Sequence, residues 1–469
     1  MRRVPLLCFV FKFDKLSGIH ADRSLGTVVA NWESNRAMRT TATAKIFILP
    51  ALGFALNAAV TSTGFAQVGS FGTSTTLEPP PRSATQTTPP KTADTALTLG
   101  SWQVYPTMFG GVIYDTNINQ AATGAQSSYG FRIAPSIAAN RDDGINRTTA
   151  YGMVDARIYT RQSGNNSDVV SAKVGVANKY QPVADWIFGA GADFTRQSNL
   201  FTTFGVDRSL KTFNPTGNGL SPTANATPYN QTSGNLSAQK NFDKAFVLVQ
   251  GSVVNMSFDD SNTSTTSPNG TTFNGSLRGG VWFTPVFYGF AEAGADHRNF
   301  SNRSLSSNGY RVTGGVGTEQ VGLLRGEIFG GYQEEDFKGI ANTGSAVFGL
   351  RGEYLPLKEL SIHASVDQSI GASQLVNTPT SSRVTTALAS VDYTIARQWT
   401  AAGRAGYIHT EFVSNARRDD AWTVGATLSY SIVRNFDATI DFQHLELKSN
   451  AAAQSFARDV ATLGLTYRY

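Results

Sequence analysis

Oppositely charged residues recur two positions apart in segments that otherwise alternate between apolar and polar side chains. The pairs are Asp155/Arg157, Arg325/Glu327 and Arg351/Glu353. Residues two apart in a β-strand point to the same face, so each pair places both signs of charge side by side. A ring of such charges in a pore selects the solutes that pass. The alternative is a solvated wall whose charges neutralise one another, because neither sign dominates.

The same pattern places a larger set of charged side chains on one face of the predicted strands. We predict that these residues line the lumen of a β-barrel and tune the passage of solutes. They are Arg132, Asp155, Arg157, Asp193, Arg311, Glu319, Arg325, Glu327, Arg351, Glu353, Asp367, Asp392, Arg404, Asp437 and Asp441.

Residue patterns typical of enzymes are weak in this sequence. The histidines beyond residue 66 are His297, His363, His409 and His444, and they fall on separate predicted strands. Three of them lie near the predicted rim beside acids, where some barrel enzymes keep their catalytic groups. No nucleophile-elbow, zinc-protease or P-loop pattern occurs, and no spacing is typical of metal ligands. We therefore expect no catalytic residue, no cofactor and no metal site.

Period-2 strands are the elements that must position these charges. About eighteen strand-like segments follow residue 101. Segments 245–258 and 287–300 carry apolar residues on both faces, so their register stays open. The predicted strands are 103–116, 127–140, 147–161, 168–181, 185–198, 231–242, 245–258, 272–284, 287–300, 308–320, 322–335, 344–355, 358–370, 382–395, 398–412, 420–432, 435–447 and 456–469.

The connections between these strands alternate in length. Short turns such as Asp243-Lys244 and Ala396-Arg397 alternate with long polar loops such as 199–230 and 371–381. Short periplasmic turns and long extracellular loops are typical of bacterial outer-membrane barrels. An even number of strands leaves both chain ends in the periplasm. We expect the 199–230 loop to fold inward as a constriction or plug.

The last strand has an apolar face with an aromatic end. Leu463, Leu465, Tyr467 and Tyr469 alternate with small or polar residues. In a membrane barrel the apolar face meets lipid and the polar face lines the lumen. This ending resembles the C-terminal signal that the barrel-assembly machinery recognises in outer-membrane proteins, although those proteins usually end in Phe.

Composition favours an all-β chain. Glycine is abundant, with 45 residues, while charged residues are 16%. No apolar run is long enough for a transmembrane helix. The net charge of +5 arises from residues 1–66, whose eight basic and three acidic residues, taken from 39 and 34, leave 31 of each. We therefore expect no nucleic-acid partner. The single cysteine, Cys8, also lies in that leader, so the remainder cannot form disulfides.

Residues 1–98 are predicted to contain a targeting signal and a tether rather than a folded domain. Residues 38–66 show a basic start, a short apolar stretch and a small-residue cleavage site after Ala66, which predicts a Sec-type signal peptide. Residues 1–37 precede Met38 and are interpreted as a spurious extension. Residues 67–98 are rich in Pro and Thr and predict a disordered periplasmic tether, followed by the barrel at 99–469.

The segment from Val104 to Ile118, which contains Tyr114-Asp115-Thr116-Asn117 after the Pro-rich stretch, resembles the opening of the putative β-barrel porin type 2 family. The resemblance covers residues 100–469. It implies an outer-membrane β-barrel of a Gram-negative bacterium. Some relatives resemble the wide pores of exopolysaccharide secretion, so it also implies a periplasmic polysaccharide-export partner.

Three hypotheses remain open from the sequence. The first is a passive, porin-like channel for polar solutes or an exported polysaccharide. The second is a non-conducting structural or surface-interaction barrel that acts through its extracellular loops. The third is a soluble, secreted β-rich protein.

Overall fold

The computed structural model describes residues 96–119, 121–161, 169–198, 228–258, 269–321, 323–375, 378–413, 416–451 and 455–469. The predicted extension, signal peptide and nearly all of the tether lie outside these ranges. No helix among the described residues is long and apolar enough to cross a membrane.

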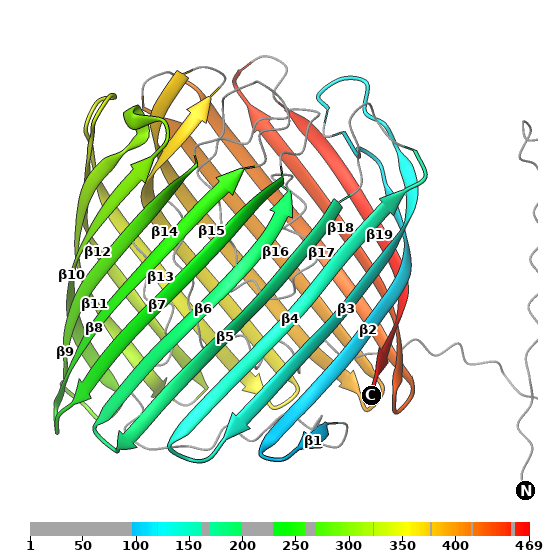
Figure 1. The fold of residues 1–469 in the computed structure, drawn as a ribbon, viewed down its shortest axis with the longest axis horizontal. Coiled ribbons are helices and arrows are strands. Elements are labelled where there is room, and N and C mark those ends of the chain that lie inside the picture. The colour runs from blue at the N-terminus through cyan, green and yellow to red at the C-terminus, as the bar shows by residue number, and fades with distance from the viewer. Residues whose placement is uncertain are drawn as a thin grey trace, which may run out of the picture. The chain divides into compact units, whose positions relative to one another are not determined.

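Antiparallel strands make up nearly all of the described chain (Figure 1). They match the predicted segments to within a few residues at most ends. The bounds are β1 Leu97–Leu99, β2 Trp102–Asp115, β3 Ser128–Asp142, β4 Asn146–Tyr159, β5 Val169–Val183, β6 Trp186–Ser198, β7 Pro228–Asn241, β8 Ala245–Phe258, β9 Gly270–Trp282, β10 Phe287–Phe300, β11 Ser307–Val321, β12 Leu324–Phe337, β13 Thr343–Leu357, β14 Leu360–Leu375, β15 Thr378–Ala396, β16 Trp399–Phe412, β17 Arg418–Val433, β18 Phe436–Ser449 and β19 Phe456–Arg468.

The eighteen strands from β2 to β19 close into a barrel. Each strand pairs antiparallel with the next, and β19 pairs with β2 from Val460↔Asp115 to Arg468↔Thr107. Closure leaves no open sheet edge, which is what a membrane requires of a β-structure. The predicted fold, a closed antiparallel barrel of about eighteen strands, is confirmed.

The short strand β1 lies outside this cycle. It pairs with Trp102–Val104 of β2, beyond the point where β19 ends, and it lies across the predicted boundary between the tether at 67–98 and the barrel at 99–469. Three residues without clear alternation carry too little periodicity to predict a strand.

The turns at one end of the barrel are short, as expected. The connection from β3 to β4 is tight because Gly144 has φ of 85°, a conformation that glycine adopts at little cost. The Asp143 carboxylate accepts hydrogen bonds from the backbone N–H of Asn146 (2.6 Å) and Ile145 (3.2 Å). These bonds stabilise the ionised carboxylate and lower the pKa of Asp143. We call this end of the barrel the turn end.

The opposite end, the loop end, carries longer connections with one exception. β14 ends at Leu375 and β15 begins at Thr378, so two residues join them. The predicted 371–381 loop is therefore wrong. Small polar residues are typical of loops, but here Ser and Thr extend the ladder between the two strands.

The two faces of the barrel wall differ in the way that the alternation predicts. Apolar side chains such as Leu236, Phe131 and Val174 are 68%, 57% and 55% exposed. Their sequence neighbours carry polar or small side chains on the opposite face. An exposed apolar band is stable where lipid covers it, and a polar inner face is stable where water fills the lumen.

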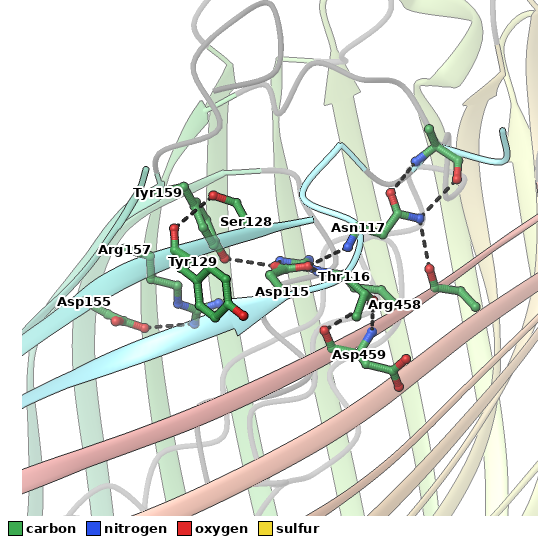
Figure 2. Close-up of polar contacts among 12 residues, drawn as sticks. Asp115, Thr116, Asn117, Ser128, Tyr129, Asp155, Arg157, Tyr159, Arg458 and Asp459 are labelled. Carbon is green, nitrogen blue, oxygen red and sulfur yellow. Dashed lines mark hydrogen bonds and ion pairs between the residues drawn. The ribbon is translucent and has the colours of Figure 1, made fainter. Parts of the chain in front are cut away.

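Closure depends on a cluster of polar contacts that joins β2 to β19 near the loop end (Figure 2). Asp115 is fully buried, and both of its carboxylate oxygens accept from Nε of Arg458, at 3.1 and 3.0 Å. The Tyr159 hydroxyl donates to Asp115 at 3.0 Å, and so does the backbone N–H of Asn117. The carboxylate is thus fully compensated by one cation and two neutral donors.

The residues that follow Asp115 continue this seam. The backbone N–H of Thr116 donates to the Asp459 carbonyl at 3.0 Å, and the Asp459 N–H donates to the Thr116 hydroxyl at 2.8 Å. The Asn117 amide donates to the Ala457 carbonyl at 2.9 Å. The Tyr114-Asp-Thr-Asn117 motif therefore fastens the first barrel strand to the last.

Removal of the seam carboxylate tests this role. Asp115→Ala leaves Arg458 buried without its counter-charge, and we expect the free energy of unfolding to fall by about 3–5 kcal/mol. Urea titration of the refolded barrel, followed by tryptophan fluorescence, measures the change. The control is Asp459→Ala, whose side chain is half-exposed and pairs with His444; it should cost about 1 kcal/mol or less. Equal losses in the two variants would contradict the assignment.

A charge on the lipid-facing surface tests the assignment of the two faces. Val174→Arg should destabilise the barrel in lipid by about 2–4 kcal/mol, because the guanidinium must leave water. Ser171→Arg, on the opposite face of the same strand, should cost much less. Urea titrations in lipid vesicles compare the two variants. Similar costs would show that β5 does not separate lipid from water.

Candidate functional site

The lumen-facing wall is the candidate site, and its charges are paired across strands. Register aligns Arg325 with Glu353 and Glu327 with Arg351 on β12 and β13. Arg325 forms an ion pair with Glu353, and Arg351 lies 3.3 Å from Glu327. Directly opposed side chains on neighbouring strands are closer than residues two apart on one strand. The predicted Arg325/Glu327 and Arg351/Glu353 pairs therefore exchange partners.

A chain of ion pairs begins on β9. Nε of Arg278 lies 2.7 Å from Glu292 on β10, and its Nη1 lies 3.1 Å from Glu327 on β12. The guanidinium also lies over the Phe290 ring, 3.9 Å from its centroid. Strands β10 and β11 separate Arg278 from Glu327. Side chains can span that distance on the concave inner face, which places these groups in the lumen.

The chain continues to β14. Arg351 lies 3.8 Å from Asp367, and Arg311 lies 3.7 Å from the same carboxylate. Both guanidinium groups also flank the Phe329 ring, at 5.3 and 5.5 Å from its centroid. This series of ion pairs contains three arginines and three carboxylates, so the wall is formally neutral.

A second group of charges lies on the strands beside the seam. Arg132 and Arg157 both contact Asp155, at 2.7 and 2.9 Å, so the predicted Asp155/Arg157 pair forms directly. Arg404 on β16 lies 2.8 Å from Asp441 on β18.

The remaining predicted lumen residues have varied surroundings. Asp437 forms an ion pair with Arg468, and Asp193 accepts from the hydroxyl groups of Ser233 and Thr195. Asp392 is half-buried on the face opposite the exposed Val391 and Tyr393. The side chain of Glu319 lies outside the described part of the structure.

Several charged residues of β10 are absent from the set of lumen residues predicted from the sequence. Glu292, Asp296 and Arg298 occupy alternate positions and point to the inner face with Tyr288 and Phe290. The inner aromatic residues hid the register, because they made both faces look apolar. The alternate spacing of the three charges was the signal that could have found them.

The end of the β14–β15 hairpin leaves the barrel wall. β13 pairs with β14 only from Gly349↔Asp367 to Leu357↔Leu360, whereas β14 and β15 stay paired to Leu375↔Thr378. The residues from 368 to 381, which we call the inward hairpin, therefore have no partner on β13. The β14 strand instead contacts β12, and β15 contacts the short 3-10 helix η4 (Arg303–Leu305).

Two hydrogen bonds fix the position of the inward hairpin. The backbone N–H of Ile370 donates to the Gln333 side chain at 3.3 Å, and the Ile370 carbonyl accepts from Arg298 at 3.5 Å. Gln333 and Arg298 lie on the inner faces of β12 and β10. The hairpin thus crosses the inner surface of the wall, and Ile370 is fully buried there.

Arg298 anchors this contact from a fully buried position. Its Nε lies 2.7 Å from Asp296 and its Nη2 lies 2.6 Å from Glu335. Glu335 also accepts from Ser307 (3.0 Å) and from Gln333 (3.1 Å). Loss of one partner from such a buried ion cluster costs about 3–5 kcal/mol, so the cluster holds one arrangement.

Side chains of Ser381 and Arg383 also form hydrogen bonds with residues at the loop end of β13. The hydroxyl groups of Thr343 and Ser381 lie 2.6 Å apart, and Arg383 donates to Ser345 at 2.9 Å. These contacts place the residues of β15 at the end of the hairpin beside β13 at the loop end. The expected constriction at 199–230 lies outside the described residues, apart from 228–230, which begin β7.

The three predicted rim histidines all contact polar side chains, and Nε2 of His409 additionally lies 3.6 Å from Glu411. Nδ1 of His297 lies 2.7 Å from the Asn308 amide oxygen, and Nδ1 of His409 and His444 lie 2.7 Å from Asp420 and Asp459. None of these contacts includes a serine nucleophile. Within the described ranges, no three His, Cys, Asp or Glu residues gather as metal ligands.

The predicted C-terminal signal lies on the outer face of β19. Leu463, Leu465, Tyr467 and Tyr469 are all exposed there, on the surface that a membrane barrel turns to lipid.

Solved structures that resemble this chain are membrane barrels with low sequence identity. OccAB4 of Acinetobacter baumannii is 12% identical over 78% of this chain and 98% of its own, with a TM-score of 0.40. The siderophore receptor PiuA of Acinetobacter baumannii is 10% identical over 80% and 82%, with a TM-score of 0.43. A loop-deletion mutant of OmpT, an outer-membrane protein of Vibrio cholerae, is 14% identical over 79% and 100%, with a TM-score of 0.35. No curated protein matches the sequence.

The family comparison extends over most of the chain. A family described as "Putative beta-barrel porin 2" matches residues 90–469, which include every strand described above and the seam motif at Tyr114–Asn117. This chain therefore belongs to the Putative beta-barrel porin 2 family and is a porin-like outer-membrane β-barrel.

Proposed function

We propose that this barrel is a passive channel for polar solutes in the Gram-negative outer membrane. The observation that carries the proposal is the contrast between its two faces over the whole circumference. On β17, Trp422, Val424 and Ala426 alternate with Thr423, Gly425 and Thr427. Most other strands repeat this alternation, except where inner aromatic residues cluster near the turn ends of β8, β9 and β10. Barrels of 16–18 strands enclose an aqueous channel rather than a packed core.

The inward hairpin sets the narrowest part of this path in our proposal. It lies across the inner wall of β10–β13 and is held by the buried Arg298 cluster. The charges further along the lumen are largely paired with one another. We therefore expect the channel to discriminate more by size and hydrogen bonding than by the sign of the solute's charge.

A non-conducting barrel that acts through its extracellular loops is the second candidate. The inward hairpin favours it, because a rigidly anchored segment in the lumen can close the path. The export of a polysaccharide is the variant of the channel proposal that the family resemblance suggests. Its partner would be a periplasmic export protein that contacts the tether at 67–98.

Delivery to the membrane is part of the same proposal. The Sec-type signal at 38–66 would direct the chain across the inner membrane. The exposed Leu463, Leu465 and Tyr467 would then present the last strand to the barrel-assembly machinery.

Shortening the inward hairpin separates these functions. Gly371 and Ser382 face each other in the ladder, so residues 372–381 can be replaced by an Asn-Gly turn that suits a two-residue hairpin and keeps the pairing of β15 with β16. We expect the single-channel conductance in planar bilayers to rise, because most of the obstruction is removed. The matched control replaces residues 413–417, between β16 and β17, with Asn-Gly and should leave the conductance unchanged.

Each outcome of this experiment decides between the candidates. Conductance of the full chain that rises in the shortened variant supports a constricted channel. Conductance that appears only after shortening supports the closed barrel. If both folded proteins fail to conduct, the channel proposal is wrong. Heat-dependent mobility in gels shows that each variant is folded.

A further inference from the structure

The inner faces of β7, β8 and β9 carry an ordered set of uncharged hydrogen-bonding side chains. Register aligns Asn235, Ser252 and Asn274 in one row across the three strands. The next row toward the turn end holds Ser237, Gln250 and Ser276. We call these six residues the amide grid.

The amide grid lies on the lumen side, in the middle third of each strand. All six residues are half-buried, whereas the neighbouring Leu236, Val249 and Leu277 on the opposite face are exposed apolar residues. The aromatic residues nearer the turn end, such as Phe246 and Trp282, are buried against one another. The grid is therefore a partly accessible polar region of this wall, in which the amide oxygens of Asn235 and Asn274 are buried without a hydrogen-bond partner.

The charged side chains next to the amide grid are held in ion pairs. On the adjoining strand β10, Asp296 aligns with Asn274 and is paired with the fully buried Arg298. Among the described inner-face residues of β7, β8 and β9, the charged one is Arg278. Its guanidinium is held by Glu292 and Glu327 and covers the Phe290 ring. A solute at the grid would meet neutral dipoles first.

Glycines on β6 extend the accessible surface beside the grid. Gly191 and Gly189 pair with Asn235 and Ser237. A Cβ atom at Gly189 would lie 2.4 Å from the Ser237 hydroxyl oxygen, so a side chain there would displace this residue of the grid. The absence of side chains at these two positions leaves the flank of the grid open to the lumen.

The chemistry of the grid suits hydroxyl-rich, uncharged solutes. Asn and Gln offer a donor and an acceptor in fixed geometry, and Ser offers both on one rotatable group. Within the grid, Gln250 donates to Ser276 at 2.9 Å and Asn274 donates to Ser252 at 3.3 Å. These neutral bonds exchange readily with sugar hydroxyl groups, whereas a strong ion pair would have to be broken.

We propose that the amide grid is a binding site for neutral oligosaccharide chains in the lumen. This inference rests on the proposed channel function and names the class of solute for it. An anionic polysaccharide would instead need accessible, uncompensated cations. The arginines of the β9–β14 wall are each engaged by carboxylates.

Current block by sugars tests the proposal. Maltohexaose added to the full-length protein in planar bilayers should reduce the open-channel current in a saturable manner. Oligogalacturonate of the same length should block more weakly. The triple variant Asn235→Ala, Gln250→Ala, Asn274→Ala should raise the half-blocking maltohexaose concentration about tenfold or more, because three polar contacts are lost.

A matched control uses hydroxyl groups on another part of the inner wall. Thr423→Ala, Ser429→Ala, Thr439→Ala removes three neutral groups from β17 and β18 and should leave the maltohexaose block unchanged. Equal effects of the two triple variants, a stronger block by oligogalacturonate, or no block in a conducting channel would each overturn the proposal.

A second readout keeps the two proposals distinguishable. Calorimetric titration of the detergent-solubilised barrel with maltohexaose measures binding without conductance. Binding that is lost in the grid variant but absent from bilayer currents would uphold the site and refute the channel. Conductance without binding would uphold the channel and refute the site.

Discussion

A sheet in lipid must satisfy every backbone N–H and C=O group, and here one junction decides whether that is possible. Seventeen pairings join strands that follow each other in the chain, but the pairing of β19 with β2 joins residues about 340 positions apart. Closing such a long loop is entropically costly. The Asp115–Arg458 pair and the Thr116–Asp459 bonds supply directional contacts at that junction. The motif that marks the family resemblance is therefore a structural closure device rather than part of a solute site.

The inner wall follows from a second constraint, because a charged side chain that is shielded from water must be compensated by a counter-charge. Arg278, Arg311 and Arg351 share the carboxylates of Glu292, Glu327 and Asp367 across six strands. The same principle holds the inward hairpin, where Arg298 lies between Asp296 and Glu335. Ion pairing thus rigidifies one side of the lumen. The adjoining wall of β7, β8 and the middle of β9 carries neutral amides and hydroxyls, and this difference between neighbouring parts of the wall is the basis of the solute preference that we propose.

The strand pattern could be predicted well because alternation is a local property of the sequence. Tyr129, Phe131 and Ile133 against Arg132 already give the register of β3. Cross-strand partners were less accessible: Arg325 and Glu327 look like a pair along one strand, but register gives each of them a partner on β13. The inward hairpin could not be foreseen, since nothing local distinguishes Ser369–Ile370 from a strand that stays in the wall. Its path depends on Arg298 and Gln333, which are distant in sequence. The β10 charges were missed because Tyr288 and Phe290 face inward beside them.

The central claim is that adjacent residues of one strand meet different solvents. The chain has a single cysteine, Cys8, in the predicted leader, so single-cysteine variants of β8 can be compared directly. The measurement is the reaction rate of Val249→Cys, Gln250→Cys, Ser252→Cys and Val253→Cys with a water-soluble, membrane-impermeant maleimide in lipid vesicles. We predict rapid labelling at 250 and 252 and little labelling at 249 and 253. Rates that do not alternate along these four positions would contradict this claim.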